Sequence, residues 1–352
     1  MKINTFIKNV LQTNETYFIA EIGSNFDGNY DRAIKLIDLA VKAGADAVKF
    51  QHYTASSIVS DNGFKSLSAM SHQKKWSRSV YDTYDDASLN KDWTKGLYDY
   101  STSQGIDFLT SPYSIELIDF VDEYIPAYKI GSGDISWIDA IHTICKKGKP
   151  VMLATGASSM EDVVRAVEII NSYSLPLILM QCNTNYSGSI DEIEFANLNV
   201  LKKYKELYPN AILGLSDHTP GNLTVLGSYA LGCRVFEKHF TDDKSRIGPD
   251  HSFAMDFDDF SQMVAQTKLL SKALGDGEKK IEENEKDTYI VQRRSIHAKI
   301  DIKKGKVISE EDLDILRPCP RGSFHPFEKD QIIGKTAKIN IKKGETLFRE
   351  NF

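Results

Sequence analysis

Residues 17–50 read YFIAEIGSNFDGNYDRAIKLIDLAVKAGADAVKF and contain one complete strand, helix and strand unit. The outer runs YFIAEI (17–22) and ADAVKF (45–50) are short and mostly apolar, as buried strands are. Between them, DRAIKLIDLAVKAG (31–44) repeats apolar residues with a helical period and ends on Gly44, which suits a C-terminal helix cap. Such a unit is typical of a parallel sheet covered by helices.

Six further runs of the same kind follow along the chain. They are IDFLT (106–110), AYKI (127–130), PVMLA (150–154), PLILM (176–180), AILGL (211–215) and CRVFE (233–237). Helical patterns such as MEDVVRAVEIINSYS (160–174) separate them. Eight such units predict an α/β fold, a closed (β/α)8 TIM barrel over residues 1–275. An open doubly wound sheet has a similar periodicity and is the alternative.

The composition of the 352-residue chain excludes several classes of protein. Hydrophobic residues make up 41% and charged residues 26%, the mix of a globular protein and not of a disordered or collagen-like chain. A formal net charge of −6 gives no overall basic field for a nucleic acid or an anionic membrane. We find no secretion signal and expect no membrane span. The four cysteines form no Cys-x-x-Cys pair, which predicts reduced thiols and a cytoplasmic protein.

The composition and hydrophobic pattern of the sequence change near residue 276. Residues 276–292, DGEKKIEENEKDTYIVQ, are highly charged and predict a linker. Beyond it, AKIDIKKGKVI (298–308) and AKINIKKGETL (337–347) are near copies, each an alternating strand pattern with a Lys-Gly turn. Residues 293–352 therefore predict a small β-rich domain with an internal duplication. A domain of this size buries little surface, so we expect it to lean on another surface.

Polar residues stand at nearly every predicted strand end. In a parallel barrel the active site lies at the carboxyl ends of the strands, so we expect one convergent site. Its candidates are Glu21, Lys49, Gln51, Ser111, Lys129, Ser132, Thr155, Gln181, Asn183, Tyr186, Ser216, His218 and His239. Two lysines in one cavity would repel unless an anion neutralised them, and the Gly-Ser-Gly and Thr-Gly turns offer donors that suit phosphate. The sequence thus predicts a phosphorylated substrate.

Two histidines end adjacent predicted strands. His218 and His239 could converge on one divalent cation, with Glu21 facing them as a ligand or a proton acceptor. Asp217, beside His218, has two interpretations. It either orients the imidazole or caps the loop.

With these residues assembled, the chain resembles the sialic acid synthase family, and in particular the N-acetylneuraminate and legionaminate synthases. These enzymes condense phosphoenolpyruvate with an N-acylated hexosamine to make nine-carbon 2-keto sugar acids. The resembling segments are FIAEIGSN (18–25), GADAVKFQ (44–51), TSPYS (110–114), AYKIGSGD (127–134), LATG (153–156), GLSDHT (214–219), FEKHFT (236–241) and GPDH (248–251). RRSIHAKIDIKKG (293–305) and LRP (316–318) resemble the family's antifreeze-like (SAF, β-clip) cap domain.

The resemblance implies a mechanism and an assembly. It implies a metal, manganese or magnesium, on His218 and His239, with Glu21 as the catalytic residue. It also implies that the residues around phosphoenolpyruvate and the nascent product are Lys49, Ser111, Lys129, Ser132, Ser216 and Asp250. The family's homodimer places each cap over the partner's barrel, where Arg317 would reach the acyl amide of the sugar. N-acetylmannosamine or a diacetamido-trideoxyhexose is the implied acceptor.

Three segments depart from the family pattern, two of them, residues 179–189 and 317–326, on the acceptor side and one, at Ala154, near the phosphate. In LMQCNTNYSGS (179–189), Gln181 replaces a histidine and a serine follows Tyr186 in place of proline. Ala154 replaces a common serine, and RPCPRGSFHP (317–326) is bulkier than the usual loop. GPDH is closer to neuraminate and legionaminate synthases than to pseudaminate synthases. His251 and Phe253, just after Asp250, are candidates to flank the sugar.

Two other functions fit part of the sequence. Lys129 or Lys49 could form a Schiff base in a metal-independent aldolase acting on a keto acid. The C-terminal domain alone could be a carbohydrate-binding or ice-binding module, although this leaves the polar strand ends unexplained. The insertion at residues 53–90 is a long connection after the second strand and a candidate for the rim of the site.

Overall fold

The computed structural model describes residues 5–13, 15–67, 76 and 78–352. Two compact units make up the chain, Met1–Leu274 and Gly275–Phe352, and each has its own apolar core. In the part of the chain that is described, every helix is too short or too polar to cross a membrane.

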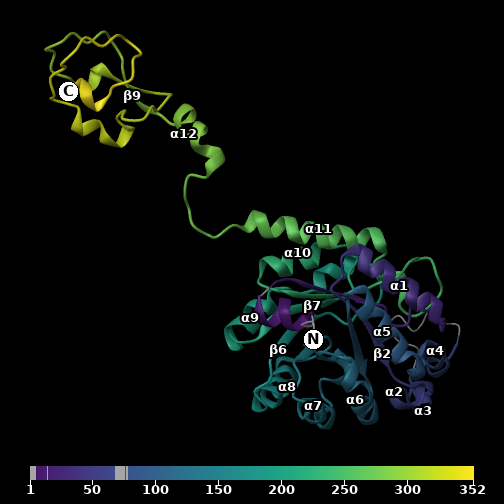
Figure 1. Cartoon of the computed structure of the whole chain (residues 1–352). Coiled ribbons are helices and arrows are strands. Elements are labelled where there is room, and N and C mark those ends of the chain that lie inside the picture. The colour runs from purple at the N-terminus through teal and green to yellow at the C-terminus, as the bar shows by residue number, and fades with distance from the viewer. Residues whose placement is uncertain (1–4, 14, 68–75, 77) are drawn as a thin grey trace. The chain divides into compact units, whose positions relative to one another are not determined.

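Eight parallel strands form the barrel of the first unit, as the sequence predicts (Figure 1). Neighbouring strands follow the order β3-β2-β1-β8-β7-β6-β5-β4, and β3 and β4 lie next to each other, which nearly closes the barrel and excludes the open sheet. The strands are β1 (Tyr17–Glu21), β2 (Ala47–His52), β3 (Asp107–Pro112), β4 (Tyr128–Ile130), β5 (Val151–Ala154), β6 (Leu177–Cys182), β7 (Ile212–Asp217) and β8 (Val235–His239).

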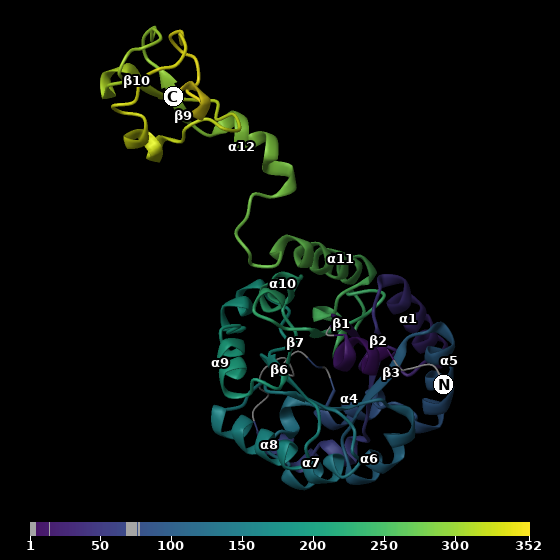
Figure 2. The ribbon, with the colours of Figure 1, turned by 60° about the vertical axis from the view of Figure 1, so that its left-hand side comes forward.

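Helices surround the strands in a ring (Figure 2). They are α1 (Tyr30–Ala43), α5 (Thr94–Gln104), α6 (Ile115–Val121), α7 (Ile138–Cys145), α8 (Met160–Ser172), α9 (Val200–Leu207), α10 (Leu223–Ala230) and α11 (Phe257–Leu274). The predicted helix at 31–44 is α1: the Asn29 side chain accepts a hydrogen bond from the Arg32 backbone N–H at 2.9 Å, and Gly44 ends the helix at φ 87°. The described part of the insertion after β2 contains three short helices, α2 (Ala55–Ile58), α3 (Asp61–Ser66) and α4 (Val80–Ala87).

Alternate residues of each strand face the two sides of the barrel wall. Outward residues such as Phe18 and Phe236 pack under the helices in the main core. Inward residues such as Ile19, Leu109 and Val235 form a second apolar cluster inside the barrel. The interior is therefore a packed core over much of its length, and inward residues become polar only at the carboxyl ends of the strands, for example at Glu21.

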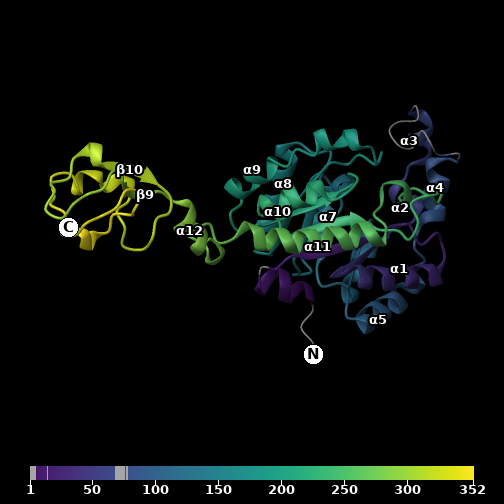
Figure 3. The same cartoon turned by 90° about the horizontal axis from the view of Figure 1, so that it is seen from above.

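Residues 6–11 cover the amino-terminal end of the barrel, where they pack on the inner apolar cluster. A short π-helix, Ile7–Gln12, lies there, and the carboxylate of Asp107 at the start of β3 accepts hydrogen bonds from the Phe6 backbone N–H and the Tyr17 hydroxyl, both at 2.7 Å. Figure 3 shows this purple helix at one end of the barrel and α2, α3 and α4 at the other. The insertion after β2 therefore stands at the open end.

The second unit contains α12 (Lys286–Gln292), β9 (Ser295–Ala298) and β10 (Leu313–Leu316), with the two strands antiparallel. α12 lies within the charged residues 276–292. The two copies of the repeat pair with each other: Ile302 and Ile341 exchange backbone hydrogen bonds, both at 2.8 Å. Their alternating pattern does not produce the two strands that we predicted, because a Lys-Gly turn follows each isoleucine and limits the pairing to isolated bridges. Gly305 and Gly344, at φ 87° and 84°, make these turns.

Candidate active site

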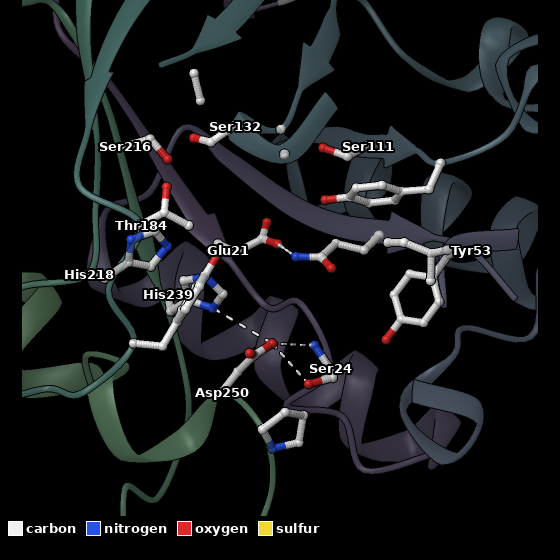
Figure 4. A pocket seen from close by; sticks show the side chains of 18 of the residues that line it. Glu21, Ser24, Tyr53, Ser111, Ser132, Thr184, Ser216, His218, His239 and Asp250 are labelled. Atoms are coloured by element: carbon white, nitrogen blue, oxygen red, sulfur yellow. Dashed lines mark hydrogen bonds and ion pairs between the residues drawn. The ribbon is translucent and has the colours of Figure 1, made fainter. Parts of the chain in front are cut away.

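A cavity of about 410 Å3 opens at the carboxyl ends of the barrel strands (Figure 4). Eleven of the fifteen predicted site residues line it: Glu21, Lys49, Gln51, Ser111, Lys129, Ser132, Tyr186, Ser216, His218, His239 and Asp250. They reach it because they occupy inward positions at or just beyond the strand ends. On β1, for example, Ile19 lies in the inner apolar cluster and Glu21, two residues later, points into the cavity.

The cavity floor contains two buried ion pairs. Lys49 Nζ lies 2.7 Å from Glu21 Oε2, and Lys129 Nζ donates to Glu237 Oε1 at 2.7 Å. A 3.8 Å contact between Lys49 and Glu237 links the two pairs. Our expectation that only an anion could neutralise the lysines was therefore wrong, because it overlooked Glu237. The pairs leave the lysines charged and positioned to exchange a carboxylate for an incoming anion.

The two glutamates have pKa values displaced in opposite directions. Burial raises the pKa of Glu21, although Lys49 opposes the shift. Burial also acts to raise the pKa of Glu237, but Lys129 and Lys49 outweigh it and hold this pKa well below its ordinary range. Glu21 also accepts a hydrogen bond from Gln51 Nε2 at 2.7 Å. Separated pKa values of this kind suit one carboxyl to proton transfer and the other to charge neutralisation.

The rings of His218 and His239 lie side by side, with centroids 5.3 Å apart. His218 Nδ1 lies 2.9 Å from the carbonyl oxygen of Asn183 and donates to it, so the lone pair of the neutral ring is on Nε2. Burial acts to lower the pKa of His218, but Cys182 and the Asn183 carbonyl outweigh it and raise this pKa. His239 Nδ1 is buried and has no hydrogen-bond partner among the described residues. Burial, together with the nearby His218 and Lys49, lowers the pKa of His239 well below its ordinary value, which favours the neutral imidazole.

These two imidazoles fit a divalent cation. Neutral imidazole nitrogens are common metal ligands, and the orphaned Nδ1 of His239 is a buried polar atom that a metal or substrate atom would satisfy. Across the described ranges, histidine, cysteine and acidic side chains do not form a group of three or more placed as metal ligands. The protein would therefore supply two imidazoles and leave further coordination positions to substrate or water.

Two loops close one side of the cavity. Asp250 Oδ2 accepts hydrogen bonds from the Ser24 backbone N–H at 3.2 Å and the Ser24 hydroxyl at 2.9 Å, and it lies 3.8 Å from His239 Nδ1. The ring of Phe253 packs 4.9 Å from His239 and 5.3 Å from Tyr186. Phe253 therefore borders the histidines, and its predicted place beside the sugar stays a prediction.

An aromatic wall on the rim was missed from the sequence. Tyr53, at the end of β2, has its ring 5.6 Å from Tyr84 of α4 and 6.0 Å from Tyr113 after β3, and all three line the cavity. Residues 68–75 and 77 of the insertion lie outside the described residues. Only the length of the insertion pointed toward the rim, because aromatic residues in a loop carry no periodic signal.

Four predicted site residues do not belong to the lining that the structure describes. Thr155 Oγ1 donates to the Met180 carbonyl at 3.0 Å, and the amides of Gln181 and Asn183 donate to the Ala196 and Phe195 carbonyls. These three side chains are held by the surrounding backbone. Arg317 lies in the second unit, where its side chain is exposed.

Asp217 does not orient His218. Its carboxylate accepts from Lys238 Nζ at 2.8 Å, from the Thr224 hydroxyl at 2.6 Å and from the Thr219 backbone N–H at 3.2 Å. The loop-cap interpretation is therefore the right one. Asp217 and Lys238 are also partners in the register of β7 and β8, so this buried ion pair ties together the two strands that carry the histidines.

Similarity to known proteins covers both units. The NeuB family matches residues 36–279, and the SAF domain matches residues 293–352. The chain is 33% identical to the pseudaminic acid synthase of Campylobacter jejuni, over 96% of this chain and 97% of that protein. It is 32% identical to the N,N'-diacetyllegionaminic acid synthase of the same organism, over 96% and 99%. A crystal structure of N-acetylneuraminic acid synthetase from Leptospira borgpetersenii aligns with 78% of this chain and 90% of its own, with a TM-score of 0.69 and 28% identity.

Proposed function

Because the chain belongs to the NeuB family and carries a SAF domain, we propose that it condenses phosphoenolpyruvate with an N-acylated amino sugar to give a nonulosonic acid and phosphate. The observation that carries the proposal is one cavity that contains two lysine–glutamate pairs and the imidazoles of His218 and His239. This combination offers cations for a phosphate and a carboxylate, a carboxyl for proton transfer, and nitrogen ligands for a metal.

In this proposal Lys49 and Lys129 hold the charged groups of phosphoenolpyruvate. Each lysine already faces a carboxylate at 2.7 Å, so an anion can replace a partner of the same charge without leaving a lysine unpaired. Ser111 and Ser216 stand beside the two lysines, 3.4 Å from Lys49 Nζ and 3.5 Å from Lys129 Nζ, and add hydroxyl donors. Asp250 and the aromatic wall of Tyr53, Tyr84 and Tyr113 would then contact the sugar.

His218 and His239 would hold a manganese or magnesium ion, which when bound supplies Lewis-acid polarisation of the aldehyde oxygen of the open-chain sugar. C3 of phosphoenolpyruvate bonds to the aldehyde carbon, whose oxygen takes up a proton to become a hydroxyl, and water adds to the positive charge that develops at C2. Glu21 takes a proton from this water as the C2–O bond forms, which balances the proton taken up by the aldehyde oxygen. The bond between C2 and the phosphate oxygen then breaks, the departing phosphate takes the proton of the new C2 hydroxyl, and the 2-keto acid remains.

The Schiff-base alternative is less favoured by the geometry. A lysine must lose its proton to attack a carbonyl, and both candidate lysines are paired with carboxylates at 2.7 Å. Burial lowers the pKa of Lys49, but Glu21 and Glu237 outweigh it and raise the pKa above its ordinary value. Borohydride trapping with pyruvate separates the two mechanisms, since only the aldolase would form a stable adduct.

For the acceptor, we propose a neutral N-acylated hexosamine of the neuraminate or legionaminate series. The GPDH segment supports this choice, whereas overall identities of 33% and 32% to a pseudaminic and a legionaminic acid synthase do not separate the two series. The proposal also includes a homodimer in which a second copy's SAF domain brings Arg317 to the acyl amide. Opposite charge supports such docking: residues 293–352 carry 14 Lys and Arg against 9 Asp and Glu, and residues 1–292 carry 29 against 40.

The test is phosphate release from phosphoenolpyruvate in the presence of N-acetylmannosamine, each diacetamido-trideoxyhexose isomer, or mannose, with and without EDTA. We expect release that needs an N-acylated acceptor and a divalent metal. His218→Ala and His239→Ala should abolish it and should weaken Mn2+ binding measured by calorimetry, whereas His142→Ala, on the outer helix α7, should do neither. Full turnover in both active-site variants would refute the metal assignment.

A further inference from the structure

The loop between β8 and α11 is anchored to the loop between β1 and α1 by two consecutive residues that point in different directions. Asp250 turns toward the cavity and accepts from the backbone N–H and hydroxyl of Ser24. His251 turns away from it, and its Nε2 donates to Asp27 Oδ1 at 2.8 Å. His251 is therefore not among the residues that line the cavity, although the sequence had made it a candidate to flank the sugar.

His251 is fully buried, at 0% exposure, and both ring nitrogens are hydrogen bonded. Nε2 must carry a proton because a carboxylate only accepts, and Nδ1 lies 2.8 Å from the hydroxyl of Thr241, just after β8. The imidazole thus joins the start of its own loop to the neighbouring loop. A Cβ at Gly248 would lie 2.7 Å from the ring carbon Cδ2, so the loop can fold over the imidazole only with glycine there.

The other end of this contact is also fixed. Asp27 sits at φ 51°, a left-handed conformation that costs free energy for a residue with a side chain. Its carboxylate is held by Arg246, with Nε at 2.8 Å and Nη2 at 2.6 Å, and lies 3.3 Å from Arg32 Nε. Arg32 in turn donates to the backbone carbonyl of Asn25 at 2.9 Å. The Asp27 carboxylate is therefore held by Arg246, Arg32 and His251, although Asp27 itself is exposed.

We propose that His251 is a positioning residue that acts through Asp27 to hold Asp250 and Phe253 in place on the acceptor side of the cavity. Both residues are within two positions of His251. In Figure 4, Asp250 and Ser24 lie across the cavity from Ser111, Ser132 and Ser216, with Glu21 and the two histidines between them. The anchored loop thus borders the side that the proposed function gives to the sugar, while phosphoenolpyruvate is held by strand residues that His251 does not contact.

Pre-ordering the loop explains the need for a buried histidine. A loop that must become ordered when the sugar binds loses conformational entropy in each binding event, and this weakens binding. With His251 in place, the ordering occurs on folding. Removing the imidazole should therefore affect binding of the sugar much more than binding of phosphoenolpyruvate.

The kinetic test rests on the proposed function and compares His251→Ala with His251→Gln, whose amide can still donate to Asp27. We expect His251→Ala to raise KM for the acceptor about tenfold or more and to leave KM for phosphoenolpyruvate within about twofold, since preorganisation acts on the loop side alone. His251→Gln should recover much of the loss. Asp27→Ala should reproduce it, and Asp27→Asn, which tolerates the left-handed backbone and still accepts a hydrogen bond, should be milder.

A second measurement keeps the inference independent of the reaction. Hydrogen–deuterium exchange followed by mass spectrometry should show faster exchange in residues 248–253 of His251→Ala, with no change in the strands and none in His142→Ala. Equal shifts in the two KM values, or unchanged exchange in this loop, would overturn the inference. If the wild-type protein turns over no acceptor, the proposed function fails, and the exchange experiment still decides whether His251 holds the loop.

Discussion

The two halves of the barrel interior differ sharply although the same strands build them. On β1, Ile19 is part of a dry apolar cluster, and Glu21, on the same face, is buried against Lys49. On β8, Val235 belongs to that cluster, and Glu237 pairs with Lys129. One half removes apolar surface from water, which favours folding. The other half buries charged side chains. Removing these charges from water costs free energy, and the attraction within the ion pairs at best offsets that cost. Stability and chemistry are thus separated by two residues along a strand, and substitutions in either half should separate them experimentally.

The largest expected effect is in the carboxyl-terminal half. Lys129→Met keeps the length of the side chain and removes its charge, so we expect kcat/KM for phosphoenolpyruvate to fall about 10³-fold, as when a key stabilising donor is lost. Phosphate release under steady-state conditions measures it. Lys147→Met, at a partly exposed lysine paired with Asp119, is the matched control and should turn over normally. A near-normal rate for Lys129→Met would show that the charge is not used by the reaction.

In the amino-terminal half, Ile19→Ala should act on stability alone. Ile19 is completely buried, so the substitution leaves a cavity, and we expect a loss of about 3 kcal/mol in the free energy of unfolding of the barrel. Denaturant titration followed by tryptophan fluorescence measures this loss. The value of kcat should be unchanged at temperatures where the variant is folded. A large fall in kcat would mean that the two halves are mechanically coupled.

The outward face of the barrel strands carries a buried histidine, which allows a test of how stability depends on pH. His52 is buried between the hydroxyls of Thr110 and Thr94, both 2.7 Å from its ring nitrogens, and burial lowers its pKa to about 4. The unfolded chain, with a histidine pKa near 6.5, binds more protons between these values, so stability falls as pH decreases from about 6.5 to 4. This window corresponds to about 3 kcal/mol.

His52→Leu should remove this dependence. Both threonine hydroxyls keep backbone acceptors, the carbonyls of Phe50 and Lys91, so the apolar side chain leaves no hydroxyl unsatisfied. We expect the unfolding free energy of the wild-type protein to fall by about 3 kcal/mol more than that of the variant between pH 7 and pH 4. Denaturant titrations of both proteins across this range measure the difference. Parallel curves would mean that His52 does not carry the dependence.

The sequence predicted the barrel well because each strand is a short apolar run, and each of the strands β1 to β8 overlaps a predicted run, with bounds that differ by up to two residues. Its errors in the site came from counting polar residues without their direction. On β5, Met152 lies in the inner cluster, so alternation turns Ala154 inward and Thr155 outward. On β6, the inward residues Met180 and Cys182 place Gln181 outward in the same way. The same count would have found Glu237, two residues after Val235.

Loop residues could not have been found in this way. Tyr53, Tyr84 and Thr184 line the cavity from positions at or beyond strand ends or in the insertion, where side-chain direction no longer alternates. Their placement depends on contacts between segments that are distant in the sequence, such as Tyr53 with Tyr84. The sequence also could not show that His239 Nδ1 is buried without a hydrogen-bond partner among the described residues. This property depends on the packing around the ring and not on the residue type.

Thr155 gives the smallest effect and the most direct check on the alternation argument. Because Ala154 replaces the family's common serine, Thr155 was the remaining hydroxyl predicted near the phosphate. The structure instead turns its side chain outward, where it accepts from the Tyr204 hydroxyl at 2.9 Å and donates to the Met180 carbonyl. Thr155→Val should therefore change KM for phosphoenolpyruvate by less than about twofold. It should cost about 1 kcal/mol of stability, because the buried Tyr204 hydroxyl loses its acceptor. A tenfold rise in KM for phosphoenolpyruvate would mean that Thr155 turns inward when substrate binds, and that alternation along the strand does not define the lining.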